Sequence, residues 1–126
     1  KKGKSFAELK SFLVQTFQEK GFNIEEISCF SSVDIKKNET GILELAQFFG
    51  VPFLTFSALE LQNAKGDFSE SEFVKKITGV SNVCERAAAL SCGENAEKTR
   101  LILKKTSGNG ITLAVAEKMA EIKTWR

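Results

Sequence analysis

The N-terminal part of the chain places apolar residues at the spacing of an amphipathic helix. The residues that would share one helix face are Phe6, Leu9, Phe12, Leu13 and Phe17. Ser5 and Glu8 have the spacing of a capping box ahead of this run, and Gly21 is suited to end it in a left-handed conformation. The pattern predicts a helix over residues 5–20.

Two later stretches have the composition of strands, with a helical pattern between them. Residues 27–35 alternate apolar and polar positions, and residues 53–56 are apolar or β-branched directly after Pro52. Proline is tolerated where a strand begins, because the missing N–H costs least there. Residues 38–50 open with polar cap residues, continue with apolar residues at helical spacing and close at a glycine, which predicts a second helix.

Further helices are predicted in the second half of the chain. Residues 57–60 and 69–72 both have capping-box sequences, which predict a short helix after the second strand and another helix that ends before Gly79. Residues 81–93 begin with Ser-Asn-Val, contain an alanine run and end at a glycine, which predicts one more helix.

The last part of the pattern is typical of a β-hairpin, and it decides the expected fold class. Apolar segments at 100–105 and 111–116 flank the turn-forming residues 106–110. Alternating helices and strands followed by this hairpin predict an α/β fold of three layers, α/β/α, with a mixed sheet that ends in a C-terminal β-hairpin. Only four strands are visible, so the sheet looks one strand short. The length of 126 residues fits a single domain.

The composition excludes several kinds of site. The chain has no histidine, which excludes triads with an imidazole base, His-rich zinc sites and a histidine axial ligand to a tetrapyrrole metal. The cysteines Cys29, Cys84 and Cys92 form no Cys-x-x-Cys pair. They are interpreted as reduced thiols of a cytoplasmic protein, with a reactive or metal-binding cysteine as the alternative. No apolar run has the length of a membrane span, so no membrane is expected as a partner.

The net charge of +2 gives no reason to expect nucleic acid as a partner, but the charges are unevenly distributed. Both ends of the chain are basic and the middle is acidic. The two basic ends either converge on an anionic ligand or form solvated faces. Any chemistry falls to carboxylates, lysines, hydroxyls or backbone amides.

Residues 33–39 are the first candidate for polar chemistry. Asp34 follows the first predicted strand, Lys36 comes two residues later, and Glu39 precedes a helix. In open α/β sheets, ligands bind outside the carboxyl ends of strands and near helix N-termini. The alternative is that Asp34 only caps the loop and that the lysines are solvated.

Two other segments carry weaker signals. Ser107-Gly108 and Asn109-Gly110 form either an anion-binding nest of backbone amides beside Lys104 and Lys105 or a plain hairpin turn. Glu85 begins a predicted helix, where an acidic residue is ordinarily a surface residue favoured by the helix dipole. A pairing of Glu85 with Arg86 or with a ligand is the alternative. No P-loop and no GxGxxG motif is present.

Four blocks of sequence, taken together, resemble the C-terminal domain of CbiG and its stand-alone relative CobE in cobalamin biosynthesis. They come in the family's order and lie within residues 3–116. The blocks are residues 30–46 (FSSVDIKKNETGILELA), residues 50–61 (GVPFLTFSALEL), residues 79–90 (GVSNVCERAAAL) and residues 103–116 (LKKTSGNGITLAVA). Family members begin with a strand ahead of Lys1-Lys2-Gly3. The resemblance therefore implies that residues 1–126 are a single domain of a longer protein and that the missing strand precedes it.

The resemblance implies a role in cobalamin biosynthesis. CbiG-like proteins act on cobalt-precorrin-5A, open its δ-lactone and release acetaldehyde. The expected partners are this cobalt-precorrin tetrapyrrole, other domains of the same polypeptide and other enzymes of the pathway. No cofactor of the protein itself and no protein-bound metal are expected, because cobalt enters as part of the substrate. The alternative is a CobE-like module that binds or carries the tetrapyrrole, or docks other subunits, without catalysis.

The resemblance also suggests site residues. Asp34 or Glu85 is expected to act as the base toward a water that attacks the lactone. Substrate binding is assigned to Lys36, Glu39, Lys105, Ser107, Gly108 and Thr112. Among these, Lys36 and Lys105 would hold carboxylates of the macrocycle, and the amides of Ser107-Gly108 would bind the developing oxyanion.

Overall fold

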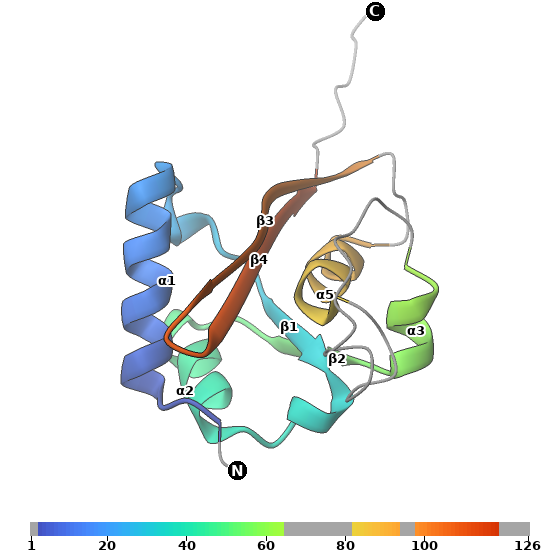
Figure 1. Cartoon of the computed structure of the whole chain (residues 1–126), viewed down its shortest axis with the longest axis horizontal. Coiled ribbons are helices and arrows are strands. Elements are labelled where there is room, and N and C mark those ends of the chain that lie inside the picture. The colour runs from blue at the N-terminus through green and yellow to red at the C-terminus, as the bar shows by residue number, and fades with distance from the viewer. Residues whose placement is uncertain (1–2, 65–81, 94–97, 119–126) are drawn as a thin grey trace, which may run out of the picture.

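The computed structural model describes residues 3–64, 82–93 and 98–118 of the chain (Figure 1). The helices are α1 (Phe6–Lys20), α2 (Thr40–Phe49), α3 (Ala58–Gln62) and α5 (Val83–Ser91), and the 3-10 turns are η1 (Ile24–Glu26) and η2 (Asp34–Lys36). The strands are β1 (Phe30–Val33), β2 (Phe53–Phe56), β3 (Thr99–Gly108) and β4 (Ile111–Lys118). The helix predicted between residues 69 and 79 lies outside the described residues.

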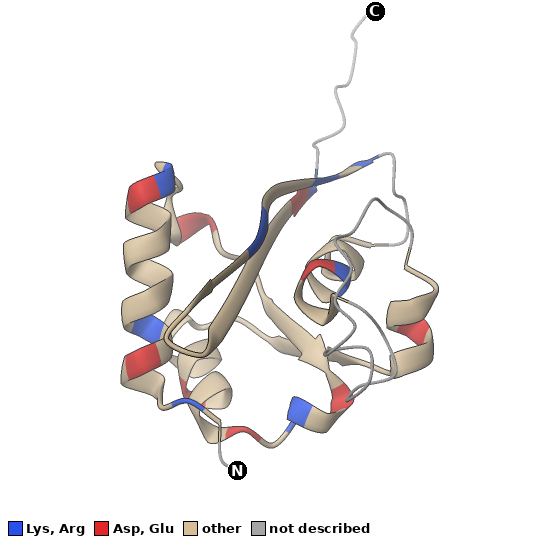
Figure 2. Cartoon of the chain, viewed as in Figure 1, with Lys and Arg blue, Asp and Glu red and all other residues tan. Residues whose placement is uncertain are grey.

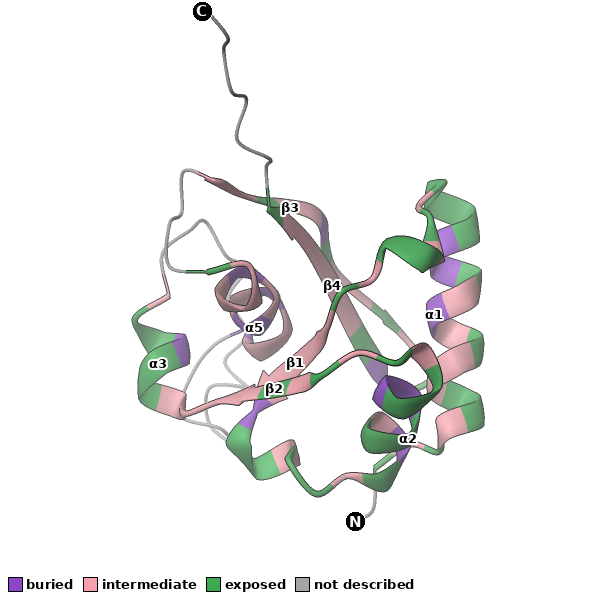
Figure 3. Ribbon diagram, turned by 180° about the vertical axis from the view of Figure 1, so that it is seen from behind, coloured by how far each residue is buried: buried purple, intermediate pink, exposed green. Residues whose placement is uncertain are grey.

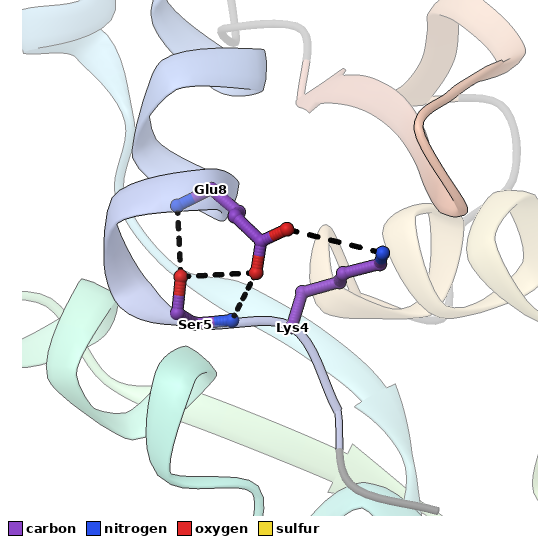
Figure 4. Close-up of polar contacts among 3 residues, drawn as sticks. All are labelled: Lys4, Ser5 and Glu8. Carbon is purple, nitrogen blue, oxygen red and sulfur yellow. Dashed lines mark hydrogen bonds and ion pairs between the residues drawn. The ribbon is translucent and has the colours of Figure 1, made fainter.

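The capping signals read from the sequence act as predicted. The Ser5 hydroxyl accepts the Glu8 N–H, the Glu8 carboxylate accepts the Ser5 N–H, and Lys4 lies beside this box (Figure 4). Ser57 and Glu60 form the same box at the start of α3. Gly21 and Gly50 end α1 and α2 with positive φ, as expected for glycine after a helix.

The first predicted strand is shorter than its sequence pattern indicates. Only Phe30–Val33 pair as a strand, while a 3-10 turn lies on either side of them in the chain. The side chain of Asn23 accepts the Glu25 N–H and so bends the backbone into η1, and η2 begins directly after Val33. Alternation of apolar residues therefore extends beyond the segment that has a strand partner.

The strands form two hydrogen-bonded pairs. β1 and β2 are parallel, in register from Phe30 opposite Phe53 to Val33 opposite Phe56. β3 and β4 form the predicted C-terminal antiparallel hairpin, which is longer than expected and contains register shifts. Within the described residues the two pairs are not bonded to each other, so each of these four strands has one edge without a strand partner there. The expected further strand stays a prediction.

Two apolar clusters on opposite faces of the strands produce the three layers. α1 and α2 cover one face, where Leu13, Phe17 and Leu45 pack with residues of β1 and β4. α3 and α5 cover the other face, where Val33, Leu61 and Ala87 form the second cluster. The predicted α/β class with helices on both faces is confirmed. Among the described residues, no helix is both long enough and apolar enough to cross a membrane.

One glycine is needed for a close approach that fixes the N-terminal segment. A Cβ on Gly41 would lie 2.1 Å from the carbonyl oxygen of Lys4, so any larger residue would push the backbone ahead of α1 away from α2. Lys4 also lies near the hairpin turn, since a Cβ on Gly110 would come 3.2 Å from its Nζ. The start of the chain is therefore held between α2 and the β3–β4 turn.

Candidate functional site

The N-terminus of α5 is built around Asn82, which has a left-handed backbone with φ of 50°. Its side-chain Oδ1 accepts the Glu85 N–H at 3.3 Å and so caps the helix. Asparagine tolerates this conformation better than most residues, because its short polar side chain bonds locally. Asn82 is 1% exposed, so this cap is enclosed by protein rather than by solvent.

Glu85 is fully buried on the first turn of the same helix. Its carboxylate Oε2 accepts the backbone N–H of Lys105 at 2.6 Å and so ties α5 to strand β3. The expectation that Glu85 is a surface residue favoured by the helix dipole is wrong. Every residue of α5 is buried or half-buried, because the helix packs against β1, β4, β3 and α3 (Figure 3).

Cys84 lies next to this carboxylate. Its Sγ donates to Asn82 Oδ1 at 3.5 Å. The pKa of the Cys84 thiol is raised to about 11, first by burial and then by the charge of Glu85, while the charge of Lys105 and hydrogen bonds from the Glu85 backbone and the Thr112 side chain act in the opposite direction. The thiol therefore stays protonated at neutral pH, and its environment shows that Lys105 and Thr112 of the hairpin face the start of α5.

The predicted site residues on the hairpin lie on two faces. Ser107 is the direct cross-strand partner of Thr112, so their side chains share a face. A Cβ on Gly108 would instead lie 2.7 Å from the ring of Phe12, which places Gly108 against α1. The turn itself consists of Asn109 and Gly110, both with positive φ, as in a type I′ hairpin. Ser107 and Gly108 belong to the ladder rather than to a loop.

The segment after β1 holds the remaining predicted residues. Asp34 is exposed at the first position of η2. Lys36 Nζ lies 3.1 Å from Glu39 Oε2, and the two side chains are 44% and 24% exposed. Figure 2 shows charges of both signs along this segment, in contrast to the lysines and arginine of β3. Lys36 is thus already partnered by a carboxylate of its own segment.

Comparison with known proteins identifies the family. Residues 1–116 match the family described as Cobalamin synthesis G C-terminus. The chain belongs to this family. The cobalt-precorrin-5A hydrolase of Priestia megaterium is 35% identical over 115 residues, which are 91% of this chain and 29% of that protein. A probable cobalt-precorrin-5A hydrolase of Methanocaldococcus jannaschii is 36% identical over 96 residues, 71% of this chain and 30% of its own length. The chain therefore spans less than a third of these curated relatives.

Two solved structures share the fold of this chain. CobE, a protein from the cobalamin (vitamin B12) biosynthetic pathway, superposes with a TM-score of 0.84 at 25% identity, over 97% of this chain and 87% of CobE. The cobalamin biosynthesis protein chiG from Agrobacterium tumefaciens superposes with a TM-score of 0.65 at 16% identity, over 96% of this chain and 94% of chiG. The second likeness concerns the fold alone. The predicted place of the chain in cobalamin biosynthesis is confirmed.

The structure brings some predicted residues together and separates others. Glu85, Lys105 and Thr112 meet at the start of α5, while Lys36 and Glu39 form a separate pair after β1. The two regions are joined beneath the surface, because Val83 of α5 packs against the cluster that contains Val33 of β1.

Sequence reasoning did not single out Asn82 as a site residue, and it interpreted Cys84 as a reduced thiol, with a reactive or metal-binding cysteine as the alternative. The signal that was available is the Ser-Asn-Val sequence at residues 81–83, which places an N-cap asparagine directly before a helix. That signal does not predict burial or a left-handed backbone. Both follow from the packing of α5 between the hairpin and β1.

Proposed function

We propose that this domain binds cobalt-precorrin-5A and contributes to opening its δ-lactone, with Glu85 as the general base. The observation that carries the proposal is a fully buried carboxylate beside Lys105 and Asn82 in a family whose curated members are named cobalt-precorrin-5A hydrolases. A general base needs a fixed carboxylate within hydrogen-bond reach of water. The bond from the Lys105 N–H to Oε2 fixes the orientation of Glu85.

In the proposed reaction Glu85 takes a proton from a water molecule whose oxygen bonds to the lactone carbonyl carbon. The bond between that carbon and the ring oxygen then breaks, and the ring oxygen takes the proton from Glu85, which leaves a carboxylic acid and an alcohol. The alcohol carbon departs with its methyl group as acetaldehyde when its bond to the macrocycle breaks; the electron pair of that bond stays on the macrocycle and the hydroxyl proton is lost. Lys105 would hold a peripheral carboxylate of the macrocycle by a charge-assisted bond. Lys36 is a weaker candidate for this contact, because Glu39 already neutralises it. Cobalt enters only as part of the substrate in this proposal.

The experiment compares three variants in the full natural polypeptide that carries this domain. We expect Glu85→Gln to abolish release of acetaldehyde from cobalt-precorrin-5A, while Asp34→Asn retains it and Lys36→Ala loses little. Acetaldehyde is measured together with the mass of the tetrapyrrole product. Full turnover by Glu85→Gln, or loss of turnover in Asp34→Asn, would remove Glu85 from the role of base.

A second candidate is a module that binds the tetrapyrrole without catalysis. The observation that favours it is the likeness to CobE, since this chain covers most of that protein but only 29% to 31% of the hydrolases. In that case the domain would bind cobalt-precorrin-5A and return it with unchanged mass. The same mass measurement therefore separates the two candidates.

A further inference from the structure

Asn82 combines three features that each oppose folding. Asn82 is 1% exposed, its backbone has a φ of 50°, and its Nδ2 is a buried donor without a hydrogen-bond partner among the described residues. An unsatisfied buried donor and a left-handed non-glycine backbone are both rare in native proteins. Such features gather at ligand-binding and catalytic sites, where the surrounding structure holds them in place.

The capping role of Asn82 does not explain these features. A cap requires only an oxygen acceptor, and Ser5 and Ser57 provide one with extended backbones at the starts of α1 and α3. Asn23 caps η1 with its side-chain oxygen, also from an extended backbone and at an exposed position. The helix cap therefore does not need the amide nitrogen of Asn82.

The orientation of the carboxamide is fixed by its neighbours. Oδ1 accepts the Glu85 N–H and the Cys84 Sγ–H. If the amide were flipped, its NH₂ group would face these two donors and both hydrogen bonds would be lost. Nδ2 is consequently held at the first turn of α5, next to the residue that we propose as the base. The N-terminus of a helix further favours negative charge at this place.

We infer that Asn82 Nδ2 donates a hydrogen bond to a substrate oxygen, the lactone carbonyl oxygen that becomes an oxyanion when water adds. This inference rests on the proposed function of Glu85 and adds to it the donor that the reaction requires. Ser107-Gly108, the donors expected from the resemblance, lie in the β3–β4 ladder, with Gly108 packed against Phe12. A donor placed in advance where charge develops acts in the transition state more than in substrate binding.

The test uses the full natural polypeptide and cobalt-precorrin-5A. Asn82→Asp and Asn82→Ser both keep an oxygen for the cap and remove the N–H donor. We expect kcat for acetaldehyde release to fall about a hundredfold in both, with KM little changed, as for the loss of one oxyanion donor. Asn109→Asp is the matched control, because Asn109 has a φ of 51° but is exposed in the hairpin turn. It should retain wild-type kcat.

The outcomes separate this inference from the proposed function. Thermal unfolding of each variant shows which are folded. A folded Asn82→Ser variant with wild-type kcat overturns the inference, and so does a loss confined to Asn82→Asp, which would point to the added charge. If the wild type gives no turnover, the proposed function and the inference fail together. If Glu85→Gln loses turnover while both Asn82 variants retain it, the inference about Asn82 fails and the proposed role of Glu85 stands.

A structure of the Glu85→Gln polypeptide with cobalt-precorrin-5A bound provides a measurement that does not depend on the folding of Asn82 variants. We expect a substrate oxygen within hydrogen-bond distance of Asn82 Nδ2. A water molecule as the partner of Nδ2, with the substrate elsewhere, would overturn the inference.

Discussion

The glutamates at the starts of α2 and α5 differ in almost every physical property. Glu39 precedes α2, lies partly exposed and pairs with Lys36 at 3.1 Å. Glu85 on the first turn of α5 is fully buried and accepts a backbone N–H from a strand twenty residues further along the chain. In the sequence the two carboxylates look alike. In the fold, one is a solvated ion pair and the other is part of the interior.

The difference in burial between Glu39 and Glu85 indicates which of the two carboxylates is better suited to a reaction site. Water screens an exposed pair, so its charges interact weakly with anything else. A buried carboxylate interacts more strongly with neighbouring groups, and the raised pKa of Cys84 is one result of burial and of the Glu85 charge. The start of α5 is for this reason the stronger candidate site, and the segment after β1 is the reference against which it can be tested.

The largest expected effect concerns the apolar residues that support each region. Leu61 is fully buried in the cluster beneath α5, whereas Ile35 of η2 is 68% exposed. We expect Leu61→Ala to lower the free energy of unfolding by about 3 kcal/mol, through lost burial and a residual cavity. Ile35→Ala should change it by less than about 0.5 kcal/mol. Urea unfolding of both variants measures the contrast, and similar values would contradict it.

The next effect concerns the two glutamates directly. Glu85→Ala removes the acceptor of the Lys105 N–H and should lower the free energy of unfolding by about 2–3 kcal/mol. Glu85→Gln retains an oxygen acceptor of similar shape, so its loss should be clearly smaller. Chemical denaturation of both variants tests this. Equal losses would mean that the negative charge, rather than the hydrogen bond, holds α5 to β3.

The raised pKa of Cys84 predicts a pH dependence. The folded protein holds the thiol proton more tightly than the unfolded chain, whose cysteine titrates near 9.0, so this contribution is complete below pH 9 and is lost toward pH 11. The wild type should lose on the order of 1–2 kcal/mol more than Cys84→Ala between about pH 8 and about pH 10.5. Cys92 also has a raised pKa, through burial and then Cys29, but both proteins retain it.

This comparison is favourable because the chain contains no tyrosine, so no phenol titrates in the same range. The unfolding free energy is measured at several pH values for both proteins. Parallel pH profiles would show that the Cys84 thiol is as accessible in the folded protein as in the unfolded chain.

Most of the fold could be predicted from local signals. Capping boxes at Ser5 and Ser57, glycines after α1 and α2, and Asn109-Gly110 in the turn act within a few residues, so the sequence contains the whole signal. The prediction was wrong for the length of β1, because a strand ends where its partner ends. Which residues of 27–35 pair with β2 depends on the distant segment 53–56.

The site could be predicted only in part, for the same reason. The resemblance to CbiG and CobE pointed to Glu85, Lys105 and Thr112, which the structure brings together. Local reasoning placed Glu85 on the surface, since an acidic residue at a helix start needs no tertiary partner. Burial of α5 arises from contacts with both strand pairs, and no local pattern contains that information.

The smallest expected effect is at the exposed pair after β1. Glu39→Gln should change the free energy of unfolding by at most about 0.5 kcal/mol, because water and salt screen the bond to Lys36. Even this small difference should vanish in about 1 M salt, where charges are screened within a few ångströms. Denaturation in low and high salt measures it. Since Glu39 lies against Gly3, a loss that persists in high salt would show that this carboxylate holds the N-terminal segment by packing rather than by charge.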